Sequence, residues 1–407
     1  MADAGPLSIV VLPLTNLTGD ANQAYVADGL TASLTADLSR IRDAFIVNAA
    51  TAFAYKDKPV TAQQVGKDLG VHFVLQGSVQ RDGTKIRINT QLADANSNAQ
   101  LWSETFEGDE SNLFALQDRV TTLVANSIGR EMIIVAARGS ETRKSSSKVA
   151  DLMLRARAVG LKPQSLRNFQ EQEDLCRQAL ALEPSNARVM AYLAAVLIIQ
   201  AGNFGDQMDA SVVEKKFSEG RDLVLKAKAL DPDNPGVYNT LGSYAFDHGD
   251  LAGARRAYET QLSLDPENPN AYFQLARVYL NEGEPKRTIE LLNQATSLDP
   301  KHIHEFNLLT LGWAYFALGD NDAAIGSLLK SVEKNPGFAN TYMALALAYA
   351  LKGEDAKARE AAAEFRRLDP SETLSSLRKE WASNPAKYQA LFETKFVPAW
   401  RKAGLPE

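Results

Sequence analysis

Apolar and polar residues alternate along three runs in the first third of the chain. These runs are "HFVLQGSVQ", "TKIRINTQLAD" and "AQLWSETFEG", and such alternation predicts half-buried strands. Arg81, Asp82 and Gly83 separate the first two runs and predict a hairpin turn. Apolar residues at helical spacing surround the three runs. We therefore predict a compact α/β domain over residues 1–137.

Near the N-terminus, the stretch "IVVLPLTNLTGD" reads as a strand, a turn and the start of a helix. Nucleotide-binding folds begin with the same order of elements. A turn that cradles phosphate needs several glycines, or a lysine and a hydroxyl at the helix start. This turn offers Asn16, Gly19 and Asp20, and the acidic side chain would repel phosphate. We interpret Asn16 and Asp20 as turn and capping residues.

Prolines recur at near-constant spacing through the rest of the chain, after a polar stretch at 138–149 that predicts a linker. Spacings of 48, 34, 34, 36 and 34 residues separate Pro184, Pro232, Pro266, Pro300, Pro336 and Pro370. A period of 34 residues closed by proline resembles the tetratricopeptide repeat, a unit of two helices. We predict about six such repeats over 150–370, and the longer first spacing predicts an insertion near 202–214.

Four consecutive repeats match this pattern position by position. In the first, Gly242 and Ala254 are small where two helices must cross closely, and Pro266 ends the second helix. Cys176 falls on a packing position of a degenerate first repeat, so we interpret it as a small buried hydrophobe. The last residues, 371–407, keep helical periodicity without the repeat, which predicts a helical cap on the array.

Composition excludes several classes of protein. The formal net charge is −6, which argues against a broad surface for nucleic acid. One cysteine permits neither an intrachain disulfide nor a cysteine zinc cage. No run of consecutive apolar residues is long enough for a membrane span, and no signal peptide is evident, so the default compartment is cytoplasmic, or periplasmic if the chain follows a span.

No set of residues predicts catalysis, a cofactor or a metal site. The sequence has no GxSxG, HExxH or DxDxDG motif. Two of the four histidines form "HIH" between repeats, where we interpret them as solvated loop residues. We therefore predict a chain that is not itself an enzyme.

The inner surface of the array is the candidate site. In a superhelix of helix pairs, the first helix of each pair lines this groove. Aromatic residues, asparagines and an arginine there suit capture of an extended peptide or protein segment, and the alternative is that some of them pack against the cap. The predicted groove residues are Asn239, Ser243, Phe246, Asp247, Asn270, Phe273, Arg277, Asn281, Phe306, Trp313, Phe316, Asn340 and Met343. The carboxylate clamp of related repeat proteins needs several lysines and arginines beside its asparagines, whereas Arg277 is nearly the only basic residue predicted in this groove. An acidic C-terminal tail is therefore not the expected ligand.

The N-terminal residues "SIVVLPLTNLTGDANQAYVADGLTASLTADLSRI" resemble the TolB-like domain of bacterial signalling proteins. The resemblance continues through "AYKDKPVTAQQVGKDLGVHFVLQGSVQRDGTKIRINTQLADANSNAQLWSETFEG" and "LFALQDRV", about 120 residues in all. In that family the domain commonly precedes tetratricopeptide repeats, and both follow a class III adenylate cyclase domain or a winged-helix DNA-binding domain. The ending "WRKAGLPE" is also similar to the C-termini of such cyclase chains.

Two functions follow as expectations. The first is a non-catalytic interaction scaffold in bacterial signalling, which binds a protein or peptide in the repeat groove. The second is the regulatory or sensory portion of an adenylate cyclase or a winged-helix regulator, whose catalytic aspartates or DNA-binding helix have no counterpart in this sequence. The partner, the oligomeric state and any small ligand of the TolB-like domain stay open, and a homo-oligomer is compatible with the sequence.

Overall fold

The computed structural model describes residues 5–20, 24–39, 41, 44–109, 113–139, 148–162, 164–300, 303–383 and 385–407. The chain forms two compact units, Met1–Val196 and Leu197–Glu407. Each unit is described below by itself. Most of the predicted linker at 138–149 lies outside the described residues.

A mixed sheet forms the centre of the first unit. Its strands are β1 (Ser8–Val11), β2 (Thr15–Asn16), β3 (Phe45–Ile46), β4 (Phe73–Asp82), β5 (Lys85–Asp94) and β6 (Gln100–Asp109). The strand order is β3-β1-β4-β5-β6, and β2 pairs with β4. β1 is parallel to β3 and β4, whereas β4, β5 and β6 form an antiparallel meander. The predicted hairpin is confirmed, but Arg81 and Asp82 belong to β4, so the turn is only Gly83 and Thr84.

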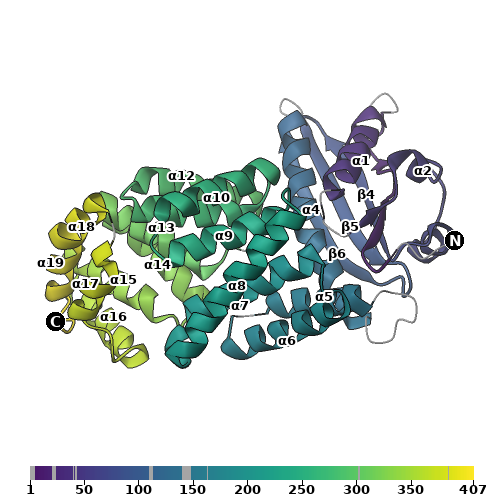
Figure 1. Ribbon diagram of the computed structural model, residues 1–407. Coiled ribbons are helices and arrows are strands. Elements are labelled where there is room, and N and C mark those ends of the chain that lie inside the picture. The colour runs from purple at the N-terminus through teal and green to yellow at the C-terminus, as the bar shows by residue number, and fades with distance from the viewer. Residues whose placement is uncertain are drawn as a thin grey trace. The chain divides into compact units, whose positions relative to one another are not determined.

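Helices cover both faces of this sheet, because the apolar residues of the central strands point alternately to one face and the other. The helices of the unit are α1 (Ala24–Leu38), α2 (Ala49–Phe53), α3 (Ala62–Leu69), α4 (Leu113–Gly139), α5 (Lys148–Gly160) and α6 (Leu166–Leu182). Ile9 and Leu75 pack with α1 and α4, whereas Val10 and Val74 pack with α2 and α3. An α/β arrangement is therefore present in the first unit (Figure 1).

The second unit is built from helix pairs. Its helices are α8 (Ala210–Leu230), α9 (Pro235–Asp247), α10 (Leu251–Leu264), α11 (Pro269–Asn281), α12 (Pro285–Leu298), α13 (Glu305–Leu318), α14 (Asn321–Lys334), α15 (Ala339–Lys352) and α16 (Asp355–Leu368). α7 (Ala187–Phe204) crosses the boundary between the units. The extra length near 202–214 is not a loop, because it lengthens α7 and α8 and adds one short helical turn, η3 (Gly205–Gln207).

Small residues let the two helices of a pair approach closely. A Cβ on Gly242 of α9 would lie 2.5 Å from the ring of Tyr258 on α10, and a Cβ on Gly312 of α13 would lie 2.6 Å from Leu328 on α14. These contacts confirm the reason for small residues at the crossing. Gly319, which ends α13, has a φ of 85° that favours glycine.

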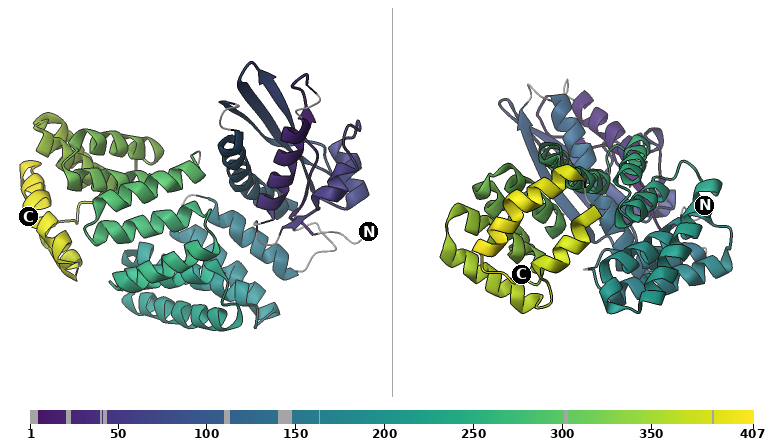
Figure 2. Two further views of the ribbon diagram at one scale, coloured as in Figure 1. Left: turned by 90° about the horizontal axis from the view of Figure 1, so that it is seen from above. Right: turned by 60° about the vertical axis from the view of Figure 1, so that its left-hand side comes forward.

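The predicted cap is helical. It consists of α17 (Leu374–Glu380), η4 (Trp381–Ser383), α18 (Ala386–Leu391), the π-helical turn η5 (Phe392–Phe396) and α19 (Val397–Lys402). These segments, yellow in Figure 2, lie against the green repeats. Trp400 is fully buried, and its indole N–H donates to the carbonyl oxygen of Pro406 at 2.8 Å, so the last residues fold back onto the cap.

Two stretches of the described helices are long and apolar enough to cross a membrane by length and composition alone. They are Arg119–Arg138, with mean hydropathy 1.3, and Ala187–Phe204, with mean hydropathy 1.4. Neither stretch is an uninterrupted apolar run, because Arg130 and Glu131 lie in the first and Arg188 in the second. A buried helix in the core of a protein can have the same length and composition, and Val124 and Ile128 of the first stretch pack in the sheet core.

Candidate functional site

The first helices of successive pairs lie side by side and form the inner surface of the repeats in the second unit. α11 contacts both α9 and α13, and α13 contacts α15. Asn270 of α11 donates through its side-chain amide to Asn239 of α9 at 3.2 Å. The repeat spacing thus brings these two predicted groove residues together on adjacent helices.

Arg277 of α11 contacts side chains of both α9 and α11. Its guanidinium carbon lies 4.4 Å from the ring centroid of Phe246 and 5.9 Å from that of Phe273. Nη1 also donates to the side-chain oxygen of Gln274 at 2.9 Å. Each contact of a guanidinium with an aromatic face contributes about 0.5–1 kcal/mol at exposed sites. The cation is therefore held in a defined orientation.

Asp247, at the end of α9, has an unusual environment for an acidic residue. The residue as a whole is exposed, but its Oδ2 atom lies close to α7. A Cβ atom added to Gly202 of that helix would be only 2.9 Å from Oδ2. Desolvation of the carboxyl raises its pKa to about 6, while the charges of Arg277 and His248 act in the opposite direction. Perturbed pKa values are frequent at functional sites.

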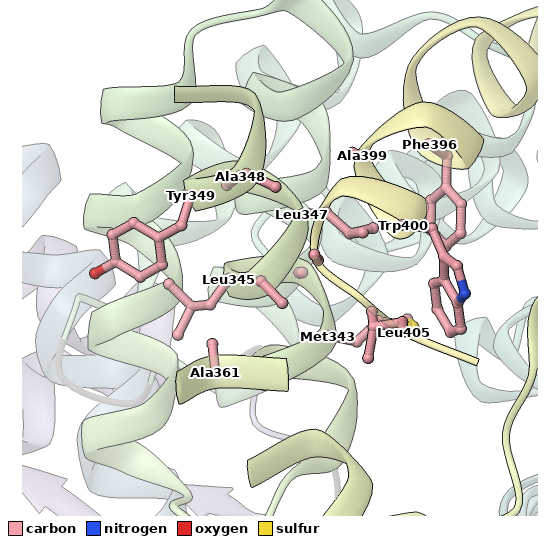
Figure 3. Packing of buried hydrophobic residues seen from close by; sticks show 14 of the residues in the cluster. Met343, Leu345, Leu347, Ala348, Tyr349, Ala361, Phe396, Ala399, Trp400 and Leu405 are labelled. Atoms are coloured by element: carbon pink, nitrogen blue, oxygen red, sulfur yellow. The ribbon is translucent and has the colours of Figure 1, made fainter. Parts of the chain in front are cut away.

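The cap covers the other end of the inner surface. The ring of Trp313 on α13 stacks on Phe396, with centroids 5.7 Å apart, and Lys395 donates to the carbonyl oxygen of Ala317 at 2.6 Å. In Figure 3, Met343 and Leu347 of α15 point toward Trp400, Phe396 and Leu405. The alternative that some groove residues pack against the cap therefore holds for this end.

The thirteen predicted groove residues consequently differ in how much of their surface is exposed. Met343 and Phe316 keep only 3% and 2% of their surface, because the cap and neighbouring helices bury them, so these two side chains offer almost no surface to a partner in this structure. Trp313 is half-buried against the cap. The other predicted groove residues are at least partly exposed: Asn239, Ser243, Phe246, Asp247, Asn270, Phe273, Arg277, Asn281, Phe306 and Asn340.

A cavity of about 250 Å³ lies between the repeats and the cap. The repeats contribute Phe246, Arg277, Leu280, Asn281, Thr310, Trp313 and Phe316 to its wall. The cap contributes Trp381, Tyr388, Leu391, Phe392 and Phe396, which the sequence reasoning had not included. The density of aromatic residues after residue 380 was the available signal, but the missing repeat pattern gave no indication of where these residues would lie.

Polar chemistry in the first unit has structural explanations. Asn16 accepts from the backbone N–H of Thr18 at 3.1 Å and donates to the carbonyl oxygen of Asp20 at 2.9 Å, which confirms it as a turn residue.

Cys176 has no exposed surface, and burial raises its pKa to about 12. The described residues contain no group of three or more His, Cys, Asp or Glu that could hold a metal.

Comparisons with known proteins identify the repeats. Family models described as tetratricopeptide repeat match residues 245–311 and 309–373. The chain contains tetratricopeptide repeats. This fold generally serves binding rather than catalysis, and the inner surface described above belongs to these repeats. The models do not extend to the sheet of the first unit.

One curated relative adds a second observation. The protein named "Putative adenylate cyclase 3", from Rhizobium meliloti (strain 1021), is 33% identical over 238 residues. These residues are 58% of this chain and 39% of that protein, so the chain aligns with well under half of the relative's length.

One solved structure supports the helical repeat fold, and it supports the fold alone. The APC/C hetero-tetramer Cut9–Hcn1 is similar with a TM-score of 0.50 at 17% identity, over 66% of this chain and 49% of that chain. YrrB, described as a TPR protein with an unusual peptide-binding site, has a TM-score of 0.35 at 20% identity, over 50% of this chain and 97% of that chain.

Proposed function

We propose that this chain is a non-catalytic scaffold that binds an extended peptide or protein segment on the inner surface of its repeats. The supporting observation is a set of partly exposed residues on α9 and α11, in which the side chains of Asn239 and Asn270 form a hydrogen bond and Arg277 contacts the rings of Phe246 and Phe273. Asparagine side chains can bond the backbone of an extended peptide, and arginine and aromatic residues are the usual hot spots of interfaces.

The cap limits where this partner binds. Because Trp313, Phe316 and Met343 contact or lie under the cap, the partner occupies the surface of α9 and α11 and extends toward the cap without displacing it. Asp247, with its raised pKa, lies in the same region. A partner with a basic or neutral side chain opposite Asp247, and a hydrogen-bonding backbone opposite the asparagines, fits this surface.

The test compares capture of proteins from a lysate of the source cells by the full chain and by substituted chains. Asn270→Ala and Arg277→Ala should each lower recovery of the partner about tenfold, which corresponds to about 1.4 kcal/mol. Arg256→Ala is the matched control, because Arg256 is exposed on the outer helix α10. Equal recovery by all variants, followed by equal affinity for the purified partner, would remove this surface from consideration.

We further propose that residues 1–137 form a TolB-like domain, that 138–149 link it to the repeats at 150–370, and that the chain acts in bacterial signalling. The support is the sequence resemblance together with the mixed sheet covered by helices on both faces. A fragment ending at residue 137 that folds cooperatively on its own would support this boundary. A fragment that stays unfolded without α5 and α6 would contradict it.

A second candidate function is the regulatory portion of an adenylate cyclase, and the 33% identity to the Rhizobium protein favours it. In this case the chain regulates a catalytic domain that is encoded in frame or nearby. The observation that tests it is the coding sequence upstream of this one, where a cyclase catalytic domain is expected. An unrelated neighbourhood, together with unchanged cyclic AMP synthesis when the chain is added to a class III cyclase, would count against it.

A further inference from the structure

The cavity between the repeats and the cap has the features of a small-molecule site rather than of a packing defect. Its wall combines residues of three inner helices with residues of the cap. We propose that this cavity binds a small organic monoanion, a carboxylate with one aromatic ring. This site goes beyond the proposed partner surface, because it needs no protein partner and does not use Asn239 or Asn270, although it shares Arg277 and Asn281 with that surface.

The volume sets the size of the ligand. A cavity of about 150 Å³ lined by aliphatic and aromatic residues accepts benzene. The cavity here measures about 250 Å³, so one ring with a short acidic arm fills it, whereas a peptide of several residues does not. The ligand is therefore a metabolite-sized molecule.

Apolar side chains make most of the wall. Leu280 and Phe246 contribute from the repeats, and Trp381, Tyr388 and Phe392 contribute from the cap. The ring of Trp381 lies 5.7 Å from that of Tyr388 and 5.4 Å from that of Phe392, both in edge-on geometry. Rings arranged in this way favour an aromatic guest, because edge-to-face and offset contacts are the preferred geometries of aromatic pairs.

One charged group selects an anion. Arg277 is the only charged residue among those that line the cavity in the described part of the chain, and no carboxylate lines it. Phe246 and Gln274 fix the guanidinium, so a carboxylate can meet it without a large loss of side-chain freedom. Asp247 is close enough to influence Arg277 electrostatically but is not part of the wall, so it weakens the preference for an anion without occupying the site.

The position of the cavity also predicts a consequence of binding. A ligand there contacts the repeats and the cap together, and both must be in place to form the site. Binding to the folded chain alone raises its stability in proportion to the logarithm of ligand concentration. Occupancy should therefore raise the unfolding temperature of the full chain.

The experiment is isothermal titration of the purified full chain with phenylacetate and, as the uncharged comparison, 2-phenylethanol. Phenylacetate should bind at least about tenfold more tightly, because its carboxylate can accept charge-assisted hydrogen bonds from Arg277, whereas the alcohol can form only weaker ones. Arg277→Gln should remove this preference while both compounds still bind weakly. Arg256→Gln, which changes an exposed arginine of α10, should leave both affinities unchanged.

A second variant separates loss of the site from loss of the fold. Leu280→Trp should fill the cavity and abolish binding of both compounds, while circular dichroism shows the helical content of the unchanged chain. The proposal is overturned if neither compound binds at millimolar concentration, if the alcohol binds as tightly as the acid, or if Leu280→Trp folds and still binds both. Because no partner protein is present, these outcomes are independent of the test of the scaffold function.

Discussion

The indole of Trp313 on α13 stacks on the ring of Phe396 in the cap, with centroids 5.7 Å apart and planes 26° from parallel. Phe396 in turn contacts Trp381, Phe392 and Trp400, so one aromatic cluster joins the cap to the inner surface of the repeats. The C-terminal segment therefore covers this end of the inner surface and closes one wall of the cavity.

Phe396→Ala should destabilise the second unit by about 3–5 kcal/mol, because the ring keeps only 4% of its surface and its removal leaves a void. Urea unfolding followed by circular dichroism measures this change. Thr394→Ala is the control, since Thr394 is exposed on the same π-helical turn, and it should change stability by less than about 0.5 kcal/mol. Equal midpoints for the two variants would show that the cap does not stabilise the repeats.

Substitution of two glycines of the same repeat by alanine should change the stability of the fold in opposite directions. At Gly312, the new methyl group would lie 2.6 Å from Leu328, so overpacking should cost about 1–3 kcal/mol. At Gly326, which is exposed within α14, nothing lies within 4 Å, and the higher helix propensity of alanine should stabilise the fold by about 0.5–1 kcal/mol. Thermal unfolding of both variants checks the signs, and destabilisation by Gly326→Ala would contradict this account.

The repeat architecture could be predicted from sequence because each position has a local physical reason. Gly249, Gly283, Gly319 and Gly353 recur at the turn inside each pair, and all four have a positive φ that glycine tolerates best. The β4–β5 hairpin was predictable for a similar reason, since alternation and a glycine turn mark it. The two-residue strands β2 and β3 are too short to show any periodicity.

The surface against which the cap packs could not be predicted in this way. The pattern around Trp313 places an aromatic residue on the inner surface, but it does not say whether that ring meets a partner or the same chain. The cap has no repeat template, and its π-helical turn over Phe392–Phe396 departs from the 3.6-residue period on which helical patterns are read. For this reason Trp381, Tyr388 and Phe392 were absent from the predicted site.

Cys176 should resist alkylation while the chain is folded. It has no exposed surface on α6, and burial raises its pKa to about 12, so the reactive thiolate is scarce at pH 8. Iodoacetamide labelling followed by mass spectrometry should be at least about a hundredfold slower in buffer than in urea, where the thiol titrates normally. The chain has one cysteine, so the signal has one source. Similar rates in both solvents would show that α6 opens readily.

Asp247 should titrate near pH 6 in the folded chain, and the charge of Arg277 should lower this midpoint. Desolvation raises the pKa of this carboxyl to about 6 from an ordinary value of 3.8. The folded state therefore binds the proton more tightly than the unfolded state, so this group favours folding below about pH 4 and loses that contribution as the pH rises through 6. Carboxyl carbon chemical shifts, assigned by comparison with Asp247→Asn, measure the midpoint.

Arg277→Gln should move that midpoint to higher pH, because the arginine charge opposes the effect of desolvation. Arg256→Gln is again the control, since it changes the same charge on the exposed face of α10 and should leave the midpoint in place. A midpoint near pH 4 in the unchanged chain would mean that the carboxyl is fully hydrated. An unchanged or lower midpoint in Arg277→Gln would show that the charge of Arg277 does not lower the pKa of Asp247.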